Sequence, residues 1–211
     1  MELISAIMPS LIDGLWNTLV LFVIVLIASL PLGIIVGILR VYAPKWVSAI
    51  IQVYIYIMRG TPLLLQLMFV FFGLPFIGIT LDRFPAAIVA FILNYTAYFA
   101  EIFRGGIISV PDGQFEAIKV LNIGSGRGFR RIIMPQVFRV VMPTVGNEVI
   151  SLVKDTSLVY VIGIGELLRA GQIAANTYAT LTPFVAVGIL YLIVTGVITL
   201  ILNRLETEVD Y

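Results

Sequence analysis

The chain has 211 residues, of which 60% are hydrophobic and 12% are charged, and its formal net charge is +1. So little polar surface cannot enclose a soluble globule of this length, and a mean hydropathy of +1.09 predicts a polytopic membrane protein. The basic residues group by loop, which excludes nucleic acid as a partner, and the absence of Cys and His excludes disulfides, Cys or His catalysis and the corresponding metal sites.

Five apolar runs along the chain are long enough to cross a bilayer, since a membrane helix needs about 20 such residues. They cover residues 14–39, 46–74, 84–103, 140–164 and 183–202. The first run contains Gly33 and Gly37 at a spacing that can mark close helix packing. Gly is common enough in membrane helices for general packing to be the simpler interpretation, and we assign the pair no function. The expected fold class is all-α, with five transmembrane helices in a single transmembrane domain over residues 1–211.

The loops between these runs differ in their basic residues. Arg40 and Lys45 flank the first loop, whereas the loops on the opposite side offer Arg83 and Arg169. The central loop and its flanks carry the densest set of cations, namely Arg104, Lys119, Arg127, Arg130, Arg131 and Arg139. Because cations are retained on the cytoplasmic side of a membrane, we expect the N-terminus outside and the C-terminus in the cytoplasm.

The longest interruption of the apolar sequence is the segment 116–136. A helix-compatible run opens it, a glycine-rich turn covers 122–128, and a basic amphipathic run restarts at Phe129. Pro135 is expected to halt that second run. The segment predicts a helix–turn–helix hairpin at about 111–136, which the charge distribution places in the cytoplasm.

This hairpin resembles the cytoplasmic coupling loop of ABC-transporter permease subunits. That loop starts Glu-Ala-Ala, places a Gly four residues later and ends Ile-x-Leu-Pro after nine more. The matching residues are Glu116, Ala117, Ile132 and Pro135, while Ile118 replaces the second Ala, Asn122 the Gly and Met134 the Leu.

Three further blocks are similar to the polar amino-acid branch of this family, the permeases of histidine, arginine and glutamine importers. They are the RGTPLLLQL stretch at 59–67, the block 94–114 and the block 154–163. Pro62 in the first block also predicts a helix kink without any functional role. With the hairpin, the resemblance covers nearly the whole chain.

The resemblance implies partners that supply what the chain lacks. A P-loop needs a Lys followed by Ser or Thr, but the lysines here precede Trp46, Val120 and Asp155, so no nucleotide site is expected. The chain is therefore not expected to be an enzyme or to hold a cofactor, and ATP and Mg²⁺ belong to two copies of a separate ABC ATPase. The residues implied to couple to that ATPase are Glu116, Ala117, Asn122, Gly124, Arg127, Arg130 and Arg131. For each arginine alone, a topology signal and lipid headgroup contacts are an equally good interpretation.

The resemblance also implies a second permease subunit and an extracellular or periplasmic amino-acid-binding protein, in a prokaryotic cell (inner) membrane. One five-span subunit cannot surround a pathway, and an identical copy in a C2 dimer is the default, with a non-identical permease as the alternative. Charges that would dock the binding protein are sought in the outer loops, where ordinary solvated residues are the simpler interpretation. The candidates are Asp82, Arg83, Glu166 and Arg169.

Polar side chains inside spans are costly and mark candidate substrate-binding residues. Asn94, Tyr98 and Glu101 share one helical face and form a candidate pathway lining. Hydrogen bonds between helices for Asn94 and Tyr98, and an ion pair between Glu101 and Arg104, would explain the same stripe without a ligand.

A second pair lies in the fourth apolar run. Glu148 and Asp155 are seven residues apart, hence on one face and about 10 Å apart along a helix, a spacing that a long cationic ligand can bridge. The alternative is that Asp155 pairs with Lys154 or with a polar group of the neighbouring subunit. Further candidates are Thr156 and Ser157 as donors to a carboxylate and Phe69 and Phe72 as an apolar or cation–π wall, with core packing as the alternative for the phenylalanines.

Acidic residues outnumber basic ones on these faces, which favours a basic amino acid such as arginine, lysine or histidine as substrate. The count sets Glu101, Glu148 and Asp155 against Lys154 and Arg104. Neutral polar amino acids such as glutamine are the alternative. Two other classes fit poorly: a secondary transporter would show an inverted repeat, and an intramembrane hydrolase on Lys154 and Ser157 would show a protease pattern.

Overall fold

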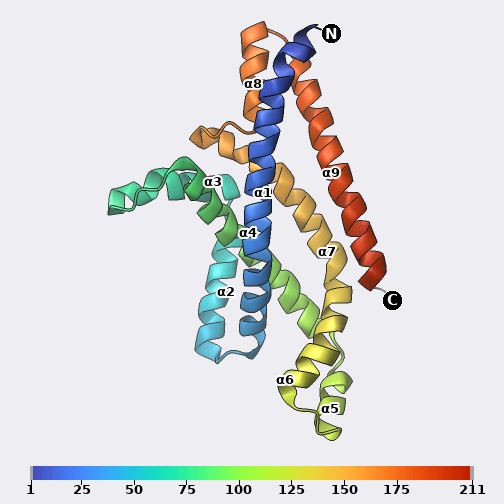
Figure 1. Cartoon of the computed structure of the whole chain (residues 1–211). Coiled ribbons are helices and arrows are strands. Elements are labelled where there is room, and N and C mark those ends of the chain that lie inside the picture. The colour runs from blue at the N-terminus through green and yellow to red at the C-terminus, as the bar shows by residue number, and fades with distance from the viewer. Residues whose placement is uncertain (1, 210–211) are drawn as a thin grey trace.

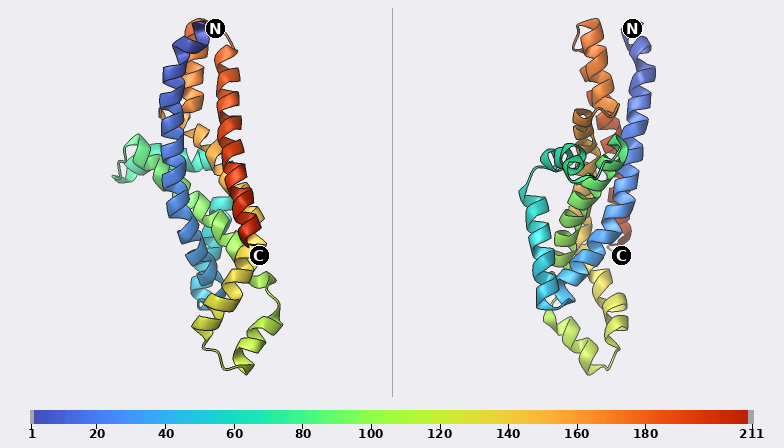
Figure 2. Two further views of the ribbon diagram at one scale, coloured as in Figure 1. Left: turned by 45° about the vertical axis from the view of Figure 1, so that its right-hand side comes forward. Right: turned by 90° about the vertical axis from the view of Figure 1, so that its left-hand side faces the viewer.

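The computed structural model describes residues 2–209, and every regular element in that range is a helix, which confirms the all-α prediction. α1 (Glu2–Tyr42) runs along the length of the molecule (Figure 1). α8 (Leu167–Tyr178) and the start of α9 (Thr182–Val209) lie beside its N-terminal end. A short helical hairpin projects from the opposite end, and Figure 2 shows the same separation from two other sides.

Three helices are each long and apolar enough to cross a membrane, namely Leu3–Tyr42, Arg83–Ser109 and Thr182–Thr207. The count rises to five when two bent pairs of helices each count as one span. α1 exceeds the predicted span 14–39, because its 41 residues extend over about 60 Å, twice the thickness of a hydrocarbon core.

The second apolar run bends sharply at Pro62, where the sequence predicts a helix kink, and the two parts together count as one span. α2 (Lys45–Gly60) and the following segment Leu63–Ile77 meet at an angle of 104°. That segment consists of α3 (Leu63–Met68), the π-helix η1 (Phe69–Gly73) and the 3₁₀-helix η2 (Leu74–Ile77). Thr61 is extended, with φ −123° and ψ 148°, a conformation that the ring of Pro62 favours because it disfavours the helical one in the residue before it.

α4 (Arg83–Ser109) forms the centre of the molecule and buries Phe91, Tyr95 and Phe99 almost completely. α1 packs closely along it at Gly33 and Gly37. A Cβ at Gly33 would lie 2.3 Å from the Phe99 Cβ, and one at Gly37 would lie 2.7 Å from the Ala100 carbonyl oxygen. The glycine pair therefore marks a specific close contact between α1 and α4, where the sequence favoured general packing.

The hairpin consists of α5 (Asp112–Val120), a tight turn and α6 (Ser125–Gly128). α6 continues without interruption through the π-helix η3 (Phe129–Ile133) into α7 (Met134–Asp155), so the predicted turn over 122–128 is shorter than expected.

Pro135 does not halt the helix, contrary to the prediction. The preceding π-turn removes the usual conflict, since the backbone N–H of Met134 donates to the Phe129 carbonyl, five residues back instead of four. The widened turn makes room for a proline ring that lacks its own N–H.

α7 ends in the 3₁₀-helix η4 (Thr156–Ile162), and the bent pair Ser125–Ile162 and α8 turns by 55°. Glu166 precedes α8 and caps it, its carboxylate accepting from the backbone N–H groups of Leu168 at 2.7 Å and Arg169 at 2.6 Å. α9 then runs back along α7 towards the hairpin end (Figure 1).

Candidate functional site

The two predicted stripes of polar residues meet through a tyrosine between them. The hydroxyl of Tyr95 on α4 donates to Asp155 Oδ2 at the end of α7, at 2.8 Å. The Tyr95 ring lies 6.3 Å from the ring of Tyr98 and stacks on Phe91, with 6.4 Å between centroids. Aromatic packing therefore fixes the donor that orients the Asp155 carboxylate.

Glu148 lies two helical turns before Asp155 on α7, and both carboxylates are half-buried. Every ion pair among the side chains of residues 3–207 involves Glu101, so neither of these two acids has a cationic partner within that range. Lys154 is exposed and does not pair with Asp155. The α7 face therefore presents two carboxylates without a counter-ion.

Asn94 is 3% exposed and serves to connect helices. Its side-chain amide donates to the Met58 carbonyl and to Gln66 Oε1, both at 3.0 Å. Gln66 in turn donates to the Met58 carbonyl at 2.9 Å and the Thr61 carbonyl at 3.1 Å, which satisfies the carbonyl groups freed where the helix breaks before Pro62. Asn94 thus joins α4 to the break between α2 and α3.

Glu101 lies in a cluster of charged residues one turn below Tyr98. The guanidinium of Arg104 donates to both of its carboxylate oxygens, at 2.8 and 2.6 Å. Arg59 approaches Glu101 at 3.9 Å and lies over the Tyr98 ring, 5.3 Å from its centroid. Glu101 is therefore already paired, as the alternative interpretation of the stripe anticipated.

The remaining predicted substrate residues lie around the end of α7. Thr156 is fully buried, and its hydroxyl donates to the Val153 carbonyl at 2.7 Å, so in this conformation that proton is not directed at a ligand. Ser157 is half-buried in η4, against which α3 packs. Phe69 and Phe72 are 64% and 50% exposed on η1, beyond the bend of the second run.

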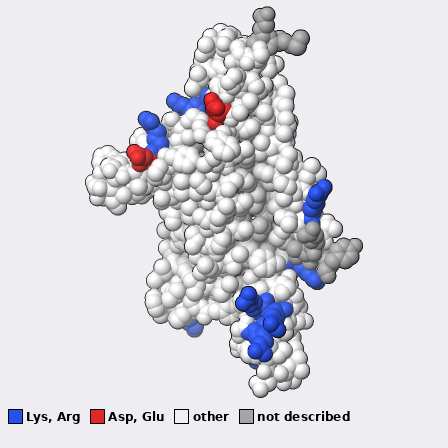
Figure 3. Space-filling model, in the orientation of Figure 1, with Lys and Arg blue, Asp and Glu red and all other residues white. Residues whose placement is uncertain are grey.

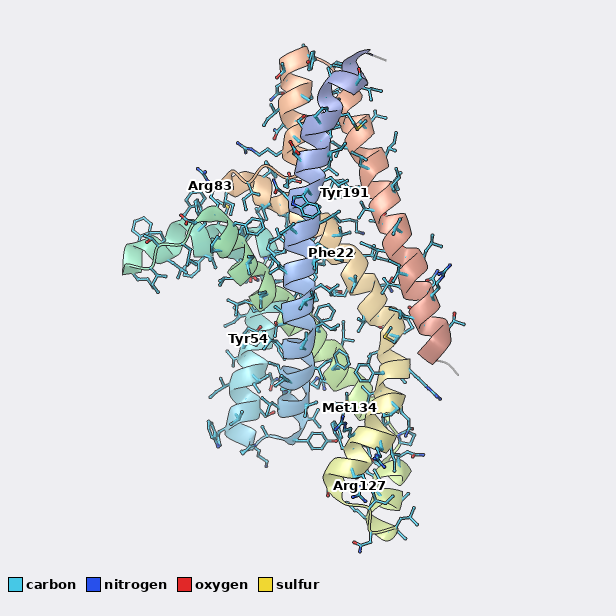
Figure 4. All side chains as sticks on the ribbon, viewed as in Figure 1. Phe22, Tyr54, Arg83, Arg127, Met134 and Tyr191 are labelled. Carbon is cyan, nitrogen blue, oxygen red and sulfur yellow. The ribbon has the colours of Figure 1, made fainter. Side chains whose placement is uncertain are left out.

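The predicted coupling residues form the exposed surface of the hairpin. Lys and Arg side chains gather there in the space-filling view (Figure 3), and Arg127 marks the position in Figure 4. Asn122 has φ +49° and ends α5, and its N–H donates to the Lys119 carbonyl at 3.1 Å. Asn tolerates this left-handed conformation nearly as well as Gly, which explains why it occupies the glycine position of the coupling-loop pattern.

Gly128 allows α5 and α6 to approach. A Cβ at this position would lie 2.6 Å from Ile118 Cγ2. Ile118 fills the space that Gly128 leaves, so the larger residue at the second Ala position is accommodated across the hairpin. Beside these helices, an apolar pocket of about 430 Å³ extends to Ile38 and Tyr42 on α1.

Two of the four predicted docking charges are exposed, in the segment that projects from the side of the molecule at the start of α4. They are Asp82 and Arg83, and Figure 4 shows Arg83 far from Arg127. Arg169 is half-buried and donates to the Tyr160 carbonyl at 2.9 Å. The prediction that Glu166 is an exposed docking charge is wrong, since it is 1% exposed and its carboxylate caps α8.

Two residues of the site, Tyr95 and Arg59, were not among the predicted ones. Tyr95 is adjacent to Asn94 but lies about 100° around the helix, outside the predicted stripe. Arg59 begins the RGTPLLLQL stretch, and a cation at that position in an apolar run could have indicated a functional residue. Within residues 2–209, no three acidic side chains are arranged to hold a metal ion.

Comparison with known proteins identifies close relatives. The family model described as "Binding-protein-dependent transport system inner membrane component" matches residues 29–211. The chain is 38% identical over 202 residues to the arginine transport system permease protein ArtQ of Bacillus subtilis, covering 95% of this chain and 92% of that protein. It is 39% identical over 201 residues to the glutamine transport system permease protein GlnP of Escherichia coli, covering 94% and 92%. The crystal structure of an amino acid ABC transporter with histidines matches with a TM-score of 0.87 at 32% identity, covering 95% of this chain and 94% of that one.

Proposed function

The chain belongs to the family of binding-protein-dependent transport system inner membrane components and is an amino-acid ABC transporter permease, and from this premise we propose that it transports basic amino acids. Membership implies an ATPase and a substrate-binding protein as partners, and the permease subunit is not itself catalytic. The proposal concerns which amino acid passes, on which side the hairpin lies, and what forms the other half of the pathway.

The observation that carries the substrate proposal is the pair of unpaired carboxylates on α7. Glu148 and Asp155 are half-buried in a span, and neither has an ion-pair partner within residues 3–207. A buried carboxylate costs several kcal/mol unless a cation or hydrogen-bond donors compensate it. Tyr95 compensates Asp155 in part, and the cationic side chain of arginine, lysine or histidine supplies the rest.

A neutral polar substrate such as glutamine is the second candidate. Arg59 lies within electrostatic range of Glu148 and offsets part of its charge. The relatives named for arginine and for glutamine are almost equally similar to this chain, at 38% and 39% identity. The two candidates therefore differ in whether the α7 carboxylates bind the substrate side chain.

The hairpin is proposed to lie in the cytoplasm and to dock on the ATPase. Its exposed residues Glu116, Arg127, Arg130 and Arg131 are available for contact. Because α6 continues through η3 into α7, a displacement of the hairpin is transmitted directly to the helix that ends at Asp155. The same placement puts the N-terminus outside and the C-terminus in the cytoplasm of a prokaryotic cell.

A second permease subunit is proposed to complete the pathway, with an identical copy as the default. The α9 helix offers an apolar surface for such a contact. Its large side chains Leu192 and Leu200 are 73% and 67% exposed and face either lipid or another subunit. Crosslinking in an active complex that finds one permease copy would reject the dimer.

Uptake by the reconstituted complex tests the substrate proposal. Labelled arginine and glutamine are compared in the wild type, Glu148→Gln and Asp155→Asn, with Asp13→Asn as a control that removes an exposed carboxylate at the far end of α1. We expect both α7 variants to reduce arginine uptake about tenfold or more, and the control to have no effect. Unchanged arginine uptake in both variants would reject the role of α7, and a wild type that carries glutamine but not arginine would reject the basic substrate.

A further inference from the structure

A second polar region lies below the α7 carboxylates, in a groove between the lower half of α4, the adjoining face of α2 and the last turn of α1. Its volume is about 860 Å³, within the range of about 300–1,000 Å³ typical of small-molecule sites. Its polar lining consists of Arg40, Gln52, Arg59, Glu101 and Arg104.

The charges in this groove do not balance. Arg104 and Glu101 neutralise one another through two short hydrogen bonds. Arg40 donates to Ser48 Oγ and, at 2.8 Å, to Gln52 Oε1, and both acceptors are neutral. Arg59 has one long contact with Glu101, at 3.9 Å, and one aromatic contact with Tyr98. Among residues 2–209, three guanidinium groups thus face one carboxylate.

Arg59 lies in an apolar run long enough to span a membrane, and Arg40 lies in the last turn of α1. Cations without a carboxylate partner at such positions indicate a missing anion. The planar guanidinium group of arginine matches the geometry of a carboxylate and binds it through two parallel hydrogen bonds. The proposed transport function brings one carboxylate into the protein with every substrate, because each amino acid carries an α-carboxylate whatever its side chain. Glu101 has further acceptor sites for the α-ammonium group beside it.

We propose that the groove lined by Arg40, Arg59 and Glu101 binds the α-amino-acid head group of the substrate, with the α-carboxylate on the two arginines and the α-ammonium on Glu101. This inference rests on the proposed function and adds a division of labour to it. The head group is bound here in the same way for every amino acid, and the side chain is selected by the carboxylates on α7.

The two regions are physically connected. Arg59 lies over the Tyr98 ring, and Tyr98 is next to Tyr95, whose hydroxyl holds Asp155. Gln52, Tyr56 and Arg59 recur at helical spacing on one face of α2, so the groove continues from Tyr98 along that helix towards Arg40. A head group in the groove therefore lies on a route between the α7 carboxylates and the hairpin end of the membrane helices.

Ligands without the α-carboxylate test this inference directly. Binding of arginine and of agmatine, which is arginine without its carboxylate, is measured on the complete reconstituted transporter for the wild type, Arg59→Gln and Arg59→Lys. Glutamine and its decarboxylated counterpart form a second pair. We expect the wild type to prefer each amino acid at least about tenfold, Arg59→Gln to abolish that preference by weakening only the amino acid, and Arg59→Lys to retain part of it.

Two further variants separate this inference from the proposed function. Lys45→Gln removes an exposed cation from the same helix and is expected to leave the preference unchanged. Glu148→Gln is expected to weaken arginine and agmatine equally, because both carry the guanidinium group. Equal loss of both ligands in Arg59→Gln, or a wild type that binds agmatine as tightly as arginine, would overturn the head-group site while leaving the transport function intact.

Discussion

The hydroxyl of Tyr95 lies 2.8 Å from Asp155 Oδ2 and joins the central helix α4 to the end of α7. The two residues are 60 positions apart in the chain, and the bond places a fixed donor on one of the two carboxylates proposed to bind the substrate side chain. Asp155 also stands where α7 tightens into the 3₁₀-helix η4. Its orientation is therefore set by a residue outside its own helix.

Removing this hydroxyl is expected to weaken substrate binding. Tyr95→Phe loses a hydrogen bond to a charged acceptor, worth about 1.5–3 kcal/mol, and leaves Asp155 free to rotate. The KM for arginine uptake should rise about tenfold, while basal ATPase activity is retained. Tyr54→Phe is the control, because its hydroxyl likewise donates across helices but to a neutral acceptor, the backbone carbonyl of Leu93 at 2.5 Å. A KM equal to that of the wild type would show that the bond does not orient Asp155 for substrate.

The close approach of α5 and α6 predicts a rescue experiment. Gly128→Ala places a Cβ 2.6 Å from Ile118 Cγ2, an overpacking expected to cost about 1–3 kcal/mol and to displace the hairpin. Co-purification of the ATPase with the permease should fall, and the double variant Gly128→Ala with Ile118→Ala should restore it in part. Gly113→Ala in α5 meets no atom within 4 Å and serves as control. Loss of the ATPase in the control alone would contradict the packing argument.

Packing of α1 on α4 predicts a stability difference between glycines. Gly37→Ala directs a Cβ to 2.7 Å from the Ala100 carbonyl oxygen, where only a backbone shift relieves the contact. The thermal unfolding midpoint of the detergent-solubilised protein should fall by several degrees. Gly188→Ala, with no atom within 4 Å, should be neutral or stabilising, since Ala favours a helix by up to about 1 kcal/mol. Equal midpoints for the two variants would argue against a glycine requirement at position 37.

The buried position of Glu166 predicts that its removal lowers the stability of the protein. Glu166→Ala removes the acceptor for two backbone N–H groups at the start of α8, and a loss of about 1–3 kcal/mol in stability is expected. Stability is read from thermal unfolding and docking from stimulation of the ATPase by the binding protein. Should a variant keep its stability yet lose stimulation, Glu166 would act in docking after all.

The exposed charge of Arg83 allows a test of whether the binding protein docks through charged residues. The residue is exposed at the start of α4, far from the hairpin residue Arg127 in Figure 4. Arg83→Glu is expected to weaken stimulation by the binding protein several-fold at low ionic strength and much less at physiological salt, because exposed charges act mainly on association. Lys119→Glu, on the hairpin, reverses a comparable exposed charge and should not change the salt dependence. Stimulation that is independent of salt in both variants would remove this role from Arg83.

The tertiary structure differs from the sequence-based prediction more in the site than in the fold. Asn94 and Glu101 share a helical face as predicted. However, the amide of Asn94 donates to the Met58 carbonyl near the α2–α3 break, and the carboxylate of Glu101 accepts from Arg104. Periodicity identifies residues on one face, whereas the partners of that face come from distant segments. Tyr95 lay outside the stripe by periodicity and became central because its hydroxyl reaches α7.

The sequence by itself determined the all-α membrane fold, the family and the position of the hairpin, because apolar runs, turn residues and motif spacing are local properties of the chain. It predicted a kink at Pro62 and a helix end at Pro135, but it did not determine how far each helix bends. Pro62 breaks the second run by 104°, while Pro135 is absorbed by a π-turn inside a continuous helix, and the difference depends on which neighbours satisfy the freed backbone groups. The pairing of charges was likewise decided only by tertiary structure, since a carboxylate is free or neutralised according to the side chains that folding brings within a few ångströms of it.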